Sequence, residues 1–200
     1  MNIAILTFDG FNELDSFIAA GILNRMKGQG WNVQITSPQE QVTSMNNVTL
    51  SAQQPLEFAN RADVVLFGSG IHTRDIAKDK TLLGRLKLNP EKQLIGGQCS
   101  GTLLMAVLGL LDNVPACTDL TTKPWVIEAG IEILNQPFTA QGNIATAGGC
   151  LASHYLAAWV IRSLAGKSAA EAAIHYVAPV GEKDAWVDRA LNLVEPYISP

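Results

Sequence analysis

Residues 94–104 read LIGGQCSGTLL, a short apolar run followed by a glycine-rich turn and a second apolar segment. The pattern predicts a buried strand up to Gln98, a sharp turn at Cys99 and a helix from about Thr102. A turn this tight strains its central residue, and the flanking glycines remove side chains that would clash. The stretch is therefore typical of a nucleophile elbow, with cysteine as the nucleophile.

This position favours reactivity at Cys99. We expect the helix that follows to favour the thiolate, and the main-chain N–H of Ser100 to face a developing negative charge. The alternative is a buried cysteine that only packs. Cys117 and Cys150 lack such a turn. Cys150 follows Ala147-Gly148-Gly149, a position compatible with the same edge of the sheet, but packing is the interpretation that we favour. The three cysteines match no zinc spacing and are an odd number for disulfides.

Strand-like and helix-like segments alternate along the chain, which predicts one α/β domain over residues 1–200. We expect a mostly parallel sheet covered by helices on both faces. The predicted strands are 3–8, 31–36, 63–67, 93–98, 114–118, 131–138 and 143–147, with a polar hairpin within 42–58. The predicted helices are 14–26, 74–86, 102–111, one starting near 124, 151–164, 169–176 and 183–194.

Composition excludes several classes of protein. The 200 residues are 48% hydrophobic and 16% charged, which argues against a disordered chain. A net charge of −4 and the absence of a basic run argue against a nucleic-acid partner. No apolar run is long enough for a membrane helix, and the first residues do not resemble a signal peptide. We expect a cytoplasmic protein.

Two further segments are predicted at the carboxyl edge of the sheet, where ligands bind in such folds. Gly68, Ser69 and Gly70 follow a buried strand and offer main-chain donors for a second half of an oxyanion hole, although an ordinary turn fits equally well. Asp15 falls in the first turn of the first helix. On the residues alone it is better explained by favourable interaction with the helix dipole, worth roughly 0.3–1 kcal/mol, than as a general acid.

Taken together, these motifs resemble the ThiJ/PfpI superfamily, which is related to class I glutamine amidotransferases. The resemblance extends from Met1 to about Gly181. The motifs that carry it are IAILTFDGF (3–11), LD (14–15), DVVLFGSG (63–70), GQCSG (97–101) and ATAGG (145–149). The Leu14-Asp15 pair, Ser100 and the GLL of 109–111 are most similar to the isonitrile hydratase branch.

The resemblance implies a flavodoxin-like fold, a homodimer, and no metal or organic cofactor. It implies that Asp15 is the partner of Cys99 and that the main-chain N–H groups of Ser69, Gly70 and Ser100 form the oxyanion hole. In the isonitrile hydratase reading, Cys99 attacks the terminal carbon of a small electrophilic substrate, R–N≡C. Asp15 supplies a proton, and water then releases an N-substituted formamide. The implied pocket residues are Gly68, Asp119, Gly148, Gly149 and His154.

The chain departs from the family pattern around the pocket. Hydratase-like relatives read Thr-His-Trp where this chain reads Thr118-Asp119-Leu120, so a histidine near the nucleophile is missing there. His154 is better explained as a partly buried, satisfied histidine than as a pocket group. Two alternatives stay open: glyoxalase or deglycase chemistry on small α-oxoaldehydes, and a non-enzymatic sensor of oxidation at the same cysteine.

Overall fold

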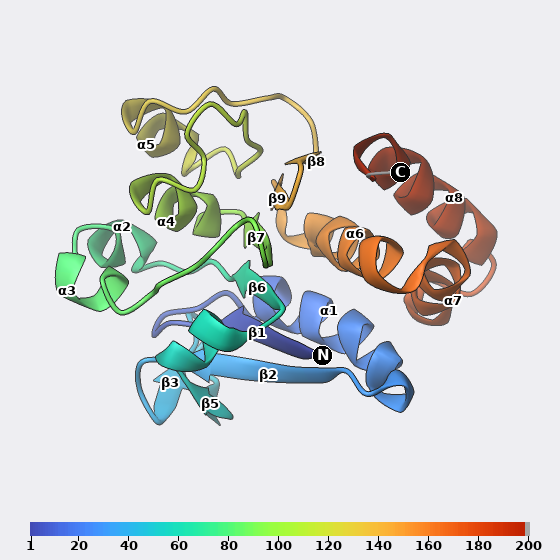
Figure 1. Ribbon diagram of the computed structural model, residues 1–200, viewed down its shortest axis with the longest axis horizontal. Helices are drawn as coiled ribbons and strands as arrows, with labels where there is room; N and C mark the ends of the chain where they lie inside the picture. Colours follow the sequence, from blue (N-terminus) through green and yellow to red (C-terminus); the bar gives the residue numbers. More distant parts are fainter. Residues whose placement is uncertain (199–200) are drawn as a thin grey trace.

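The apolar runs form one seven-stranded sheet in the computed structural model, which describes residues 1–198 (Figure 1). The strand order is β5-β2-β1-β6-β7-β9-β8, and every neighbouring pair is parallel except β8 and β9. The strands are β1 (Asn2–Leu6), β2 (Asn32–Ser37), β5 (Gln54–Pro55), β6 (Val64–Phe67), β7 (Leu94–Gln98), β8 (Phe138–Gln141) and β9 (Ile144–Ala147). A separate antiparallel ribbon joins β3 (Gln41–Thr43) to β4 (Thr49–Ser51) within the predicted hairpin.

Helices cover both faces of this sheet (Figure 1). On one face lie α1 (Glu13–Leu23), α6 (Ser153–Ala165), α7 (Lys167–Val177) and α8 (Lys183–Val194). On the other lie α2 (Thr73–Ile76), α3 (Lys80–Leu83), α4 (Gly101–Val107) and α5 (Lys123–Glu128). Short 3-10 segments occupy Asn24–Gln29, Leu56–Arg61, Cys150–Ala152 and Glu195–Tyr197. The predicted fold class, an α/β sandwich with a mostly parallel sheet, is confirmed.

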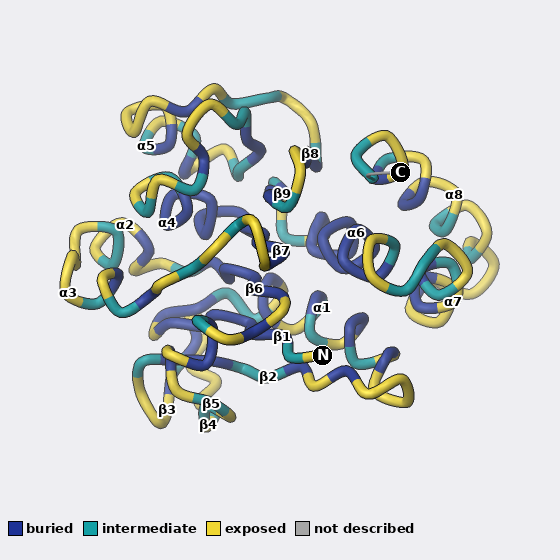
Figure 2. The backbone as a smooth tube through the Cα atoms, viewed as in Figure 1, coloured by how far each residue is buried: buried dark blue, intermediate teal, exposed yellow. Residues whose placement is uncertain are grey.

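The central strands are apolar at nearly every position because both of their faces are covered. In β1, Ile3 and Ile5 pack with α1 and α6 on one face of the sheet. Ala4 and Leu6 pack with α4 on the other face. The same alternation holds in β6. Figure 2 shows these central strands as continuously buried. Two apolar layers therefore hold the sheet, and the carboxyl ends of its strands face one edge.

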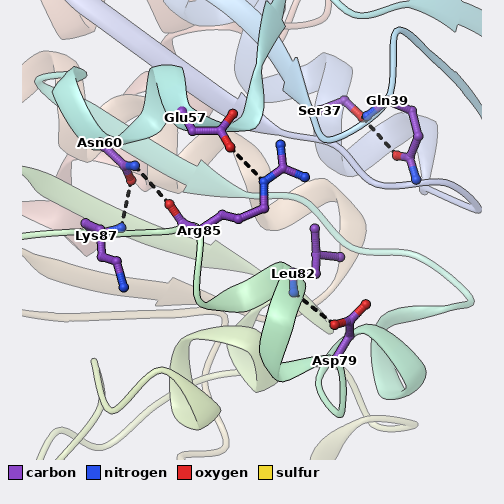
Figure 3. A network of polar contacts seen from close by, with 8 residues as sticks. All are labelled: Ser37, Gln39, Glu57, Asn60, Asp79, Leu82, Arg85 and Lys87. Carbon is purple, nitrogen blue, oxygen red and sulfur yellow. Dashed lines mark hydrogen bonds and ion pairs between the residues drawn. The ribbon is translucent and has the colours of Figure 1, made fainter.

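The predicted helix 74–86 is wrong in its length, because it forms as two short helices, α2 and α3. The carboxylate of Asp79 accepts a hydrogen bond from the N–H of Leu82 at 2.9 Å and starts a new helix there (Figure 3). Beyond α3, Asn60 binds the carbonyl of Arg85 and the N–H of Lys87, and Glu57 pairs with the Arg85 side chain (Figure 3). These contacts fix the chain in an extended path toward β7.

The predicted strand 114–118 is also wrong, because Ala116 alone pairs with a neighbouring backbone and side chains bond to the backbone of Cys117. The N–H of Cys117 donates to the hydroxyl of Thr146 at 2.8 Å, and the carbonyl of Cys117 accepts from the hydroxyl of Thr102 at 3.0 Å. Only one isolated bridge, between Ala116 and Ile133, remains. The strand predicted over 131–138 instead begins at Phe138 and pairs with β9.

Within residues 1–198, no helix combines the length and the apolar character that a membrane crossing requires.

Glycine at 101 allows α4 to begin directly against the end of β6. A Cβ atom at this position would lie 2.5 Å from the carbonyl oxygen of Phe67 and 2.7 Å from that of Gly68. Both neighbours are backbone atoms, so they cannot rotate away. The start of α4 therefore reaches the residues that follow β6 only because this side chain is absent.

We expect Gly101→Ala to lower the free energy of unfolding by about 1–3 kcal/mol, because the methyl group forces α4 away from β6. Urea denaturation measures this change. Gly28→Ala is the matched control, since a Cβ there meets nothing within 4 Å and the residue does not have a positive φ. A Gly101→Ala protein as stable as the control would contradict the proposed close contact.

Candidate active site

Cys99 occupies the turn between β7 and α4, as the sequence predicts. Its φ is +47°, a strained value for a residue with a side chain. Three hydrogen bonds hold the strained backbone. Its N–H donates to the carbonyl of Ala147 at 2.8 Å, and its carbonyl accepts from the hydroxyl of Thr118 at 2.8 Å and from the N–H of Thr102 at 3.2 Å. The surrounding chain therefore fixes the direction in which the sulfur points.

Asp15, Cys99 and Cys150 come together at the carboxyl edge of the sheet. The two sulfur atoms and one carboxylate oxygen all lie within 4.8 Å of one another. Asp15 reaches the cluster from the first turn of α1, which Asn12 caps by accepting from the N–H of Leu14. Cys150 reaches it from the turn after β9. The cluster lies where the chain order reverses between β1 and β6, which is where ligands bind in open α/β sheets.

The Asp15 carboxyl group is only 2% exposed. One of its oxygens, Oδ2, accepts a hydrogen bond from the hydroxyl of Ser69. The other, Oδ1, has no hydrogen-bond partner among the residues that the structure describes. Burial raises the pKa of Asp15, because the charged form loses its hydration, although the Ser69 hydroxyl and, less strongly, the two neighbouring thiols oppose the rise. The group is therefore suited to holding and returning a proton.

The surroundings of Cys99 oppose the thiolate that we expected. Burial and then the negative charge of Asp15 raise the pKa of the Cys99 thiol. The amide of Gln98 donates to the sulfur at 3.4 Å and partly opposes the rise. The arrangement therefore holds Cys99 as a thiol whose proton has a buried carboxylate beside it.

Of the three predicted main-chain donors, two are free. Among the residues that the structure describes, the main-chain N–H groups of Ser69 and Ser100 have no acceptor. The N–H of Gly70 instead donates to the Ser100 hydroxyl at 3.2 Å, and that hydroxyl also bonds to Thr73 at 2.8 Å. The N–H of Gly70 therefore links the turn after β6 to the turn at Cys99 and is not free to bind a substrate.

A cavity of about 430 Å³ lies beside the cluster. Among the predicted pocket residues, Gly148, Gly149 and His154 line it, and Cys150 lines it as well. Asp119 lines a second cavity of about 400 Å³, which also touches the two glycines, and its carboxylate accepts from two N–H groups at the start of α5. Gly68 lines neither, because it packs against the carbonyl of Leu6 and the side chain of Ser16.

His154 contacts aromatic rings at the cavity wall. Its Nδ1 meets the carbonyl of Leu151, and its ring lies 5.3 Å from that of Trp186. Burial lowers the pKa of His154, and its Nε2 has no partner among the residues described. The expectation of a fully satisfied histidine is therefore wrong: one ring nitrogen is bonded and the other is not.

Cys150 is the residue of the cluster whose role sequence reasoning missed. We assigned Cys150 to packing, yet its side chain is only partly buried and lies beside the Cys99 sulfur. Asn12 donates to the Cys150 sulfur at 3.2 Å, in addition to its role at the start of α1. The available signal was the Gly148-Gly149 turn after a strand that neighbours β7.

Within residues 1–198, the side-chain atoms of Asp15, Cys99 and Cys150 are close enough together that a metal ion could contact all three. Both thiols have raised pKa values, so a metal ion would have to displace their protons.

Comparisons with known proteins agree with this architecture. The model of the DJ-1/PfpI family matches residues 1–163. No curated protein matches the chain. The structure of Schizosaccharomyces pombe DJ-1 is 17% identical over 90% of this chain and 100% of its own, with a TM-score of 0.75. The ThiJ/PfpI domain protein of Brachyspira murdochii is 21% identical over 80% of this chain and 94% of its own, with a TM-score of 0.69.

Drosophila melanogaster DJ-1beta is 19% identical over 88% of this chain and 96% of its own, with a TM-score of 0.75. At these identities the solved structures show a shared fold. The match of the family model covers most of the chain and includes the elbow at Cys99 and the acidic residue Asp15. The chain therefore belongs to the DJ-1/PfpI family.

Proposed function

We propose that this protein is a cysteine-dependent enzyme that adds water to the terminal carbon of a small isonitrile and releases an N-substituted formamide. The observation that carries the proposal is the buried Asp15 carboxyl group within 4.8 Å of the Cys99 sulfur. Isonitrile hydration needs a nucleophile and one group that moves a proton to carbon. This pair supplies both without a histidine.

The first step joins the Cys99 sulfur to the isonitrile carbon. As the S–C bond forms, the thiol proton passes to the Asp15 carboxylate, whose raised pKa suits it to accept that proton. Asp15 then returns the same proton to the carbon that was attacked. The product is a thioimidate, R–N=CH–S–Cys99, in which every atom of the thiol and the isonitrile is retained.

The second step uses water. A water molecule adds to the thioimidate carbon, the C–S bond breaks, and the sulfur regains a proton. The free N–H groups of Ser69 and Ser100 are the donors we assign to the negative charge that develops during this addition. The balance is R–N≡C plus H₂O to R–NH–CHO, with Cys99 regenerated as a thiol.

The cavity supports a small, largely apolar substrate. Leu151, Tyr155 and Trp186 contribute apolar surface to its wall, which suits the hydrocarbon group of an isonitrile. An α-oxoaldehyde would need a proton moved between two carbons after it binds the sulfur. Asp15 is the one carboxyl group in the cluster that is available to move that proton between the carbons. We therefore rank α-oxoaldehyde chemistry below isonitrile hydration.

We expect Cys99→Ala to lower turnover of an aryl or alkyl isonitrile at least about a thousand-fold, because no other step replaces the covalent intermediate. Formamide release, followed by chromatography, measures this. Cys117→Ala is the control and should keep its activity, since Cys117 is fully buried outside the cluster. Formamide production by Cys99→Ala at the wild-type rate would overturn the proposal, and lactate formation from methylglyoxal alone would favour the α-oxoaldehyde alternative.

Asp15→Asn keeps the size of the side chain but cannot accept and return the proton. We expect turnover to fall about 10²- to 10⁴-fold while the fold is retained. The rate at which iodoacetamide modifies Cys99 should change as well, because the charge that acts on the thiol is removed. If turnover and alkylation are both unchanged, Asp15 does not belong to the site.

The pH dependence of stability provides an independent check on Asp15. Its pKa is raised in the folded state, so the folded state holds the proton more tightly and loses stability as the pH rises through that pKa. Asp15→Asn cannot lose stability in this way. The free energy of unfolding of the variant, relative to wild type, should therefore increase from about pH 4 toward neutral pH, as measured by urea denaturation.

Glu13→Gln is the matched control with the opposite sign. Hydrogen bonds, led by the one from Ser44, lower the pKa of Glu13, so its ionised form stabilises the folded state above the pKa of the unfolded chain. Relative to wild type, Glu13→Gln should therefore lose stability as the pH rises to the unfolded pKa of about 4.5, and its difference from wild type should stay constant from there to neutral pH. The same slope for both variants would contradict the opposite environments of these two carboxyl groups.

A further inference from the structure

Cys150 has surroundings that simple packing does not explain. Its sulfur lies within 4.8 Å of the Cys99 sulfur and of the Asp15 carboxylate, and it accepts a hydrogen bond from Asn12 at 3.2 Å. It also lines the 430 Å³ cavity, so it is the more accessible of the two sulfurs. Cys117, by contrast, is fully buried, and burial raises its pKa to about 12. Cys150 therefore has both an entry path and polar partners.

The two sulfur atoms are close enough for a modest movement to join them. A disulfide has an S–S distance of about 2.05 Å. The backbone of Cys99 is fixed by its bonds to Ala147 and Thr118, so the movement must come from the other side. Cys150 follows Gly149, which has a φ of +93° and open space around its Cα, and it begins a short 3-10 segment. This turn has room to adjust.

The cluster also contains the groups that thiol oxidation needs. A thiol reacts with a hydroperoxide as the thiolate, and the Asp15 carboxylate lies within 4.8 Å of both sulfurs, where it is placed to accept the proton of either thiol. The amides of Asn12 and Gln98 donate to the Cys150 and Cys99 sulfurs, respectively, and so stabilise negative charge on each. Each sulfur therefore has its own hydrogen-bond donor, and the two thiols share Asp15 as a base.

We propose that Cys150 is oxidised first by a hydroperoxide that enters through the cavity, and that Cys99 then closes a reversible Cys99–Cys150 disulfide. The proposal rests on the placement of the two sulfurs and not on the isonitrile chemistry. If that chemistry holds, the disulfide also removes the nucleophile and switches the enzyme off until a thiol reduces it.

The reaction balances in two steps. The Cys150 thiolate attacks one oxygen of the hydroperoxide, the O–O bond breaks, and Cys150 becomes a sulfenic acid while the other oxygen leaves as water with the thiol proton. The Cys99 thiolate then attacks the sulfenic sulfur, the S–O bond breaks, and a second water leaves with the Cys99 proton. Two thiols are oxidised to one disulfide, and hydrogen peroxide is reduced to two water molecules.

The test treats the full chain with a small excess of hydrogen peroxide, blocks the remaining thiols and maps the peptides by mass spectrometry without reduction. We expect a cross-linked pair of peptides that contain Cys99 and Cys150, lighter by two hydrogens than the separate thiols, and its loss on treatment with dithiothreitol. Cys117→Ala should form the same cross-link at the same rate. Absence of this cross-link in wild type overturns the proposal.

Single variants test which sulfur reacts first. In Cys99→Ser, dimedone should trap a sulfenic acid at Cys150 at a rate close to that of disulfide formation in wild type. In Cys150→Ser, oxidation of Cys99 should be at least about ten-fold slower, because the accessible thiol is gone. Oxidation of Cys99 at the wild-type rate in Cys150→Ser contradicts the proposed order. These measurements do not depend on isonitrile turnover, so the two proposals can fail separately.

Discussion

The turn at Cys99 depends on backbone touching backbone. Gly101 lies so close to the carbonyl groups that follow β6 that no side chain fits, and the N–H of Cys99 bonds to the end of β9. These contacts tie the carboxyl ends of three neighbouring strands to one point. They also hold Cys99 at a φ that a free chain would avoid. The other parts of the site, including the free N–H groups of Ser69 and Ser100, lie where they do because this point is fixed.

Burial of the acid beside the thiol is the second constraint. Removing Asp15 from water makes its charge costly, and the same burial keeps Cys99 protonated. Neither group is strongly acidic at rest, so a proton can be exchanged between them with little change in charge. A nucleophile of this kind is activated during the attack rather than in advance, which distinguishes it from a cysteine that depends on a helix N-terminus alone.

Much of the fold could be predicted, because strands buried on both faces leave continuous apolar runs such as 3–8 and 63–67. The elbow at Cys99 was predictable because Gly97 and Gly101 flank the cysteine between a predicted strand and a predicted helix, where a sharp turn excludes larger side chains. The strand predicted over 114–118 was wrong because the hydroxyl groups of Thr102 and Thr146 satisfy that backbone, and these partners are distant in the sequence. The helix 74–86 was wrong because Asp79 starts a new helix inside an unbroken helical pattern.

The candidate site was predictable only in part, and its chemical roles stay predictions. Cys99 and Asp15 could be named from their motifs, but their distance and burial come from how α1 meets the sheet. The two glycines before Cys150 are compatible with the correct edge of the sheet, but nothing in the sequence places its sulfur beside that of Cys99. The homodimer stays a prediction of the family resemblance, and the cytoplasmic location stays a prediction from composition.

The antiparallel turn between β8 and β9 decides which end of the sheet receives Cys150. β8 runs against the other strands, so β9 must return in the direction of β7, and the chain leaves β9 at the same edge as Cys99. Had β9 run the other way, its four residues at roughly 3.3 Å each would separate the two sulfurs by about 13 Å. The sulfurs of Cys99 and Cys150, which are far apart in the sequence, therefore meet because of the direction in which β9 runs. The hairpin of β8 and β9 sets that direction, although it contributes no reactive group itself.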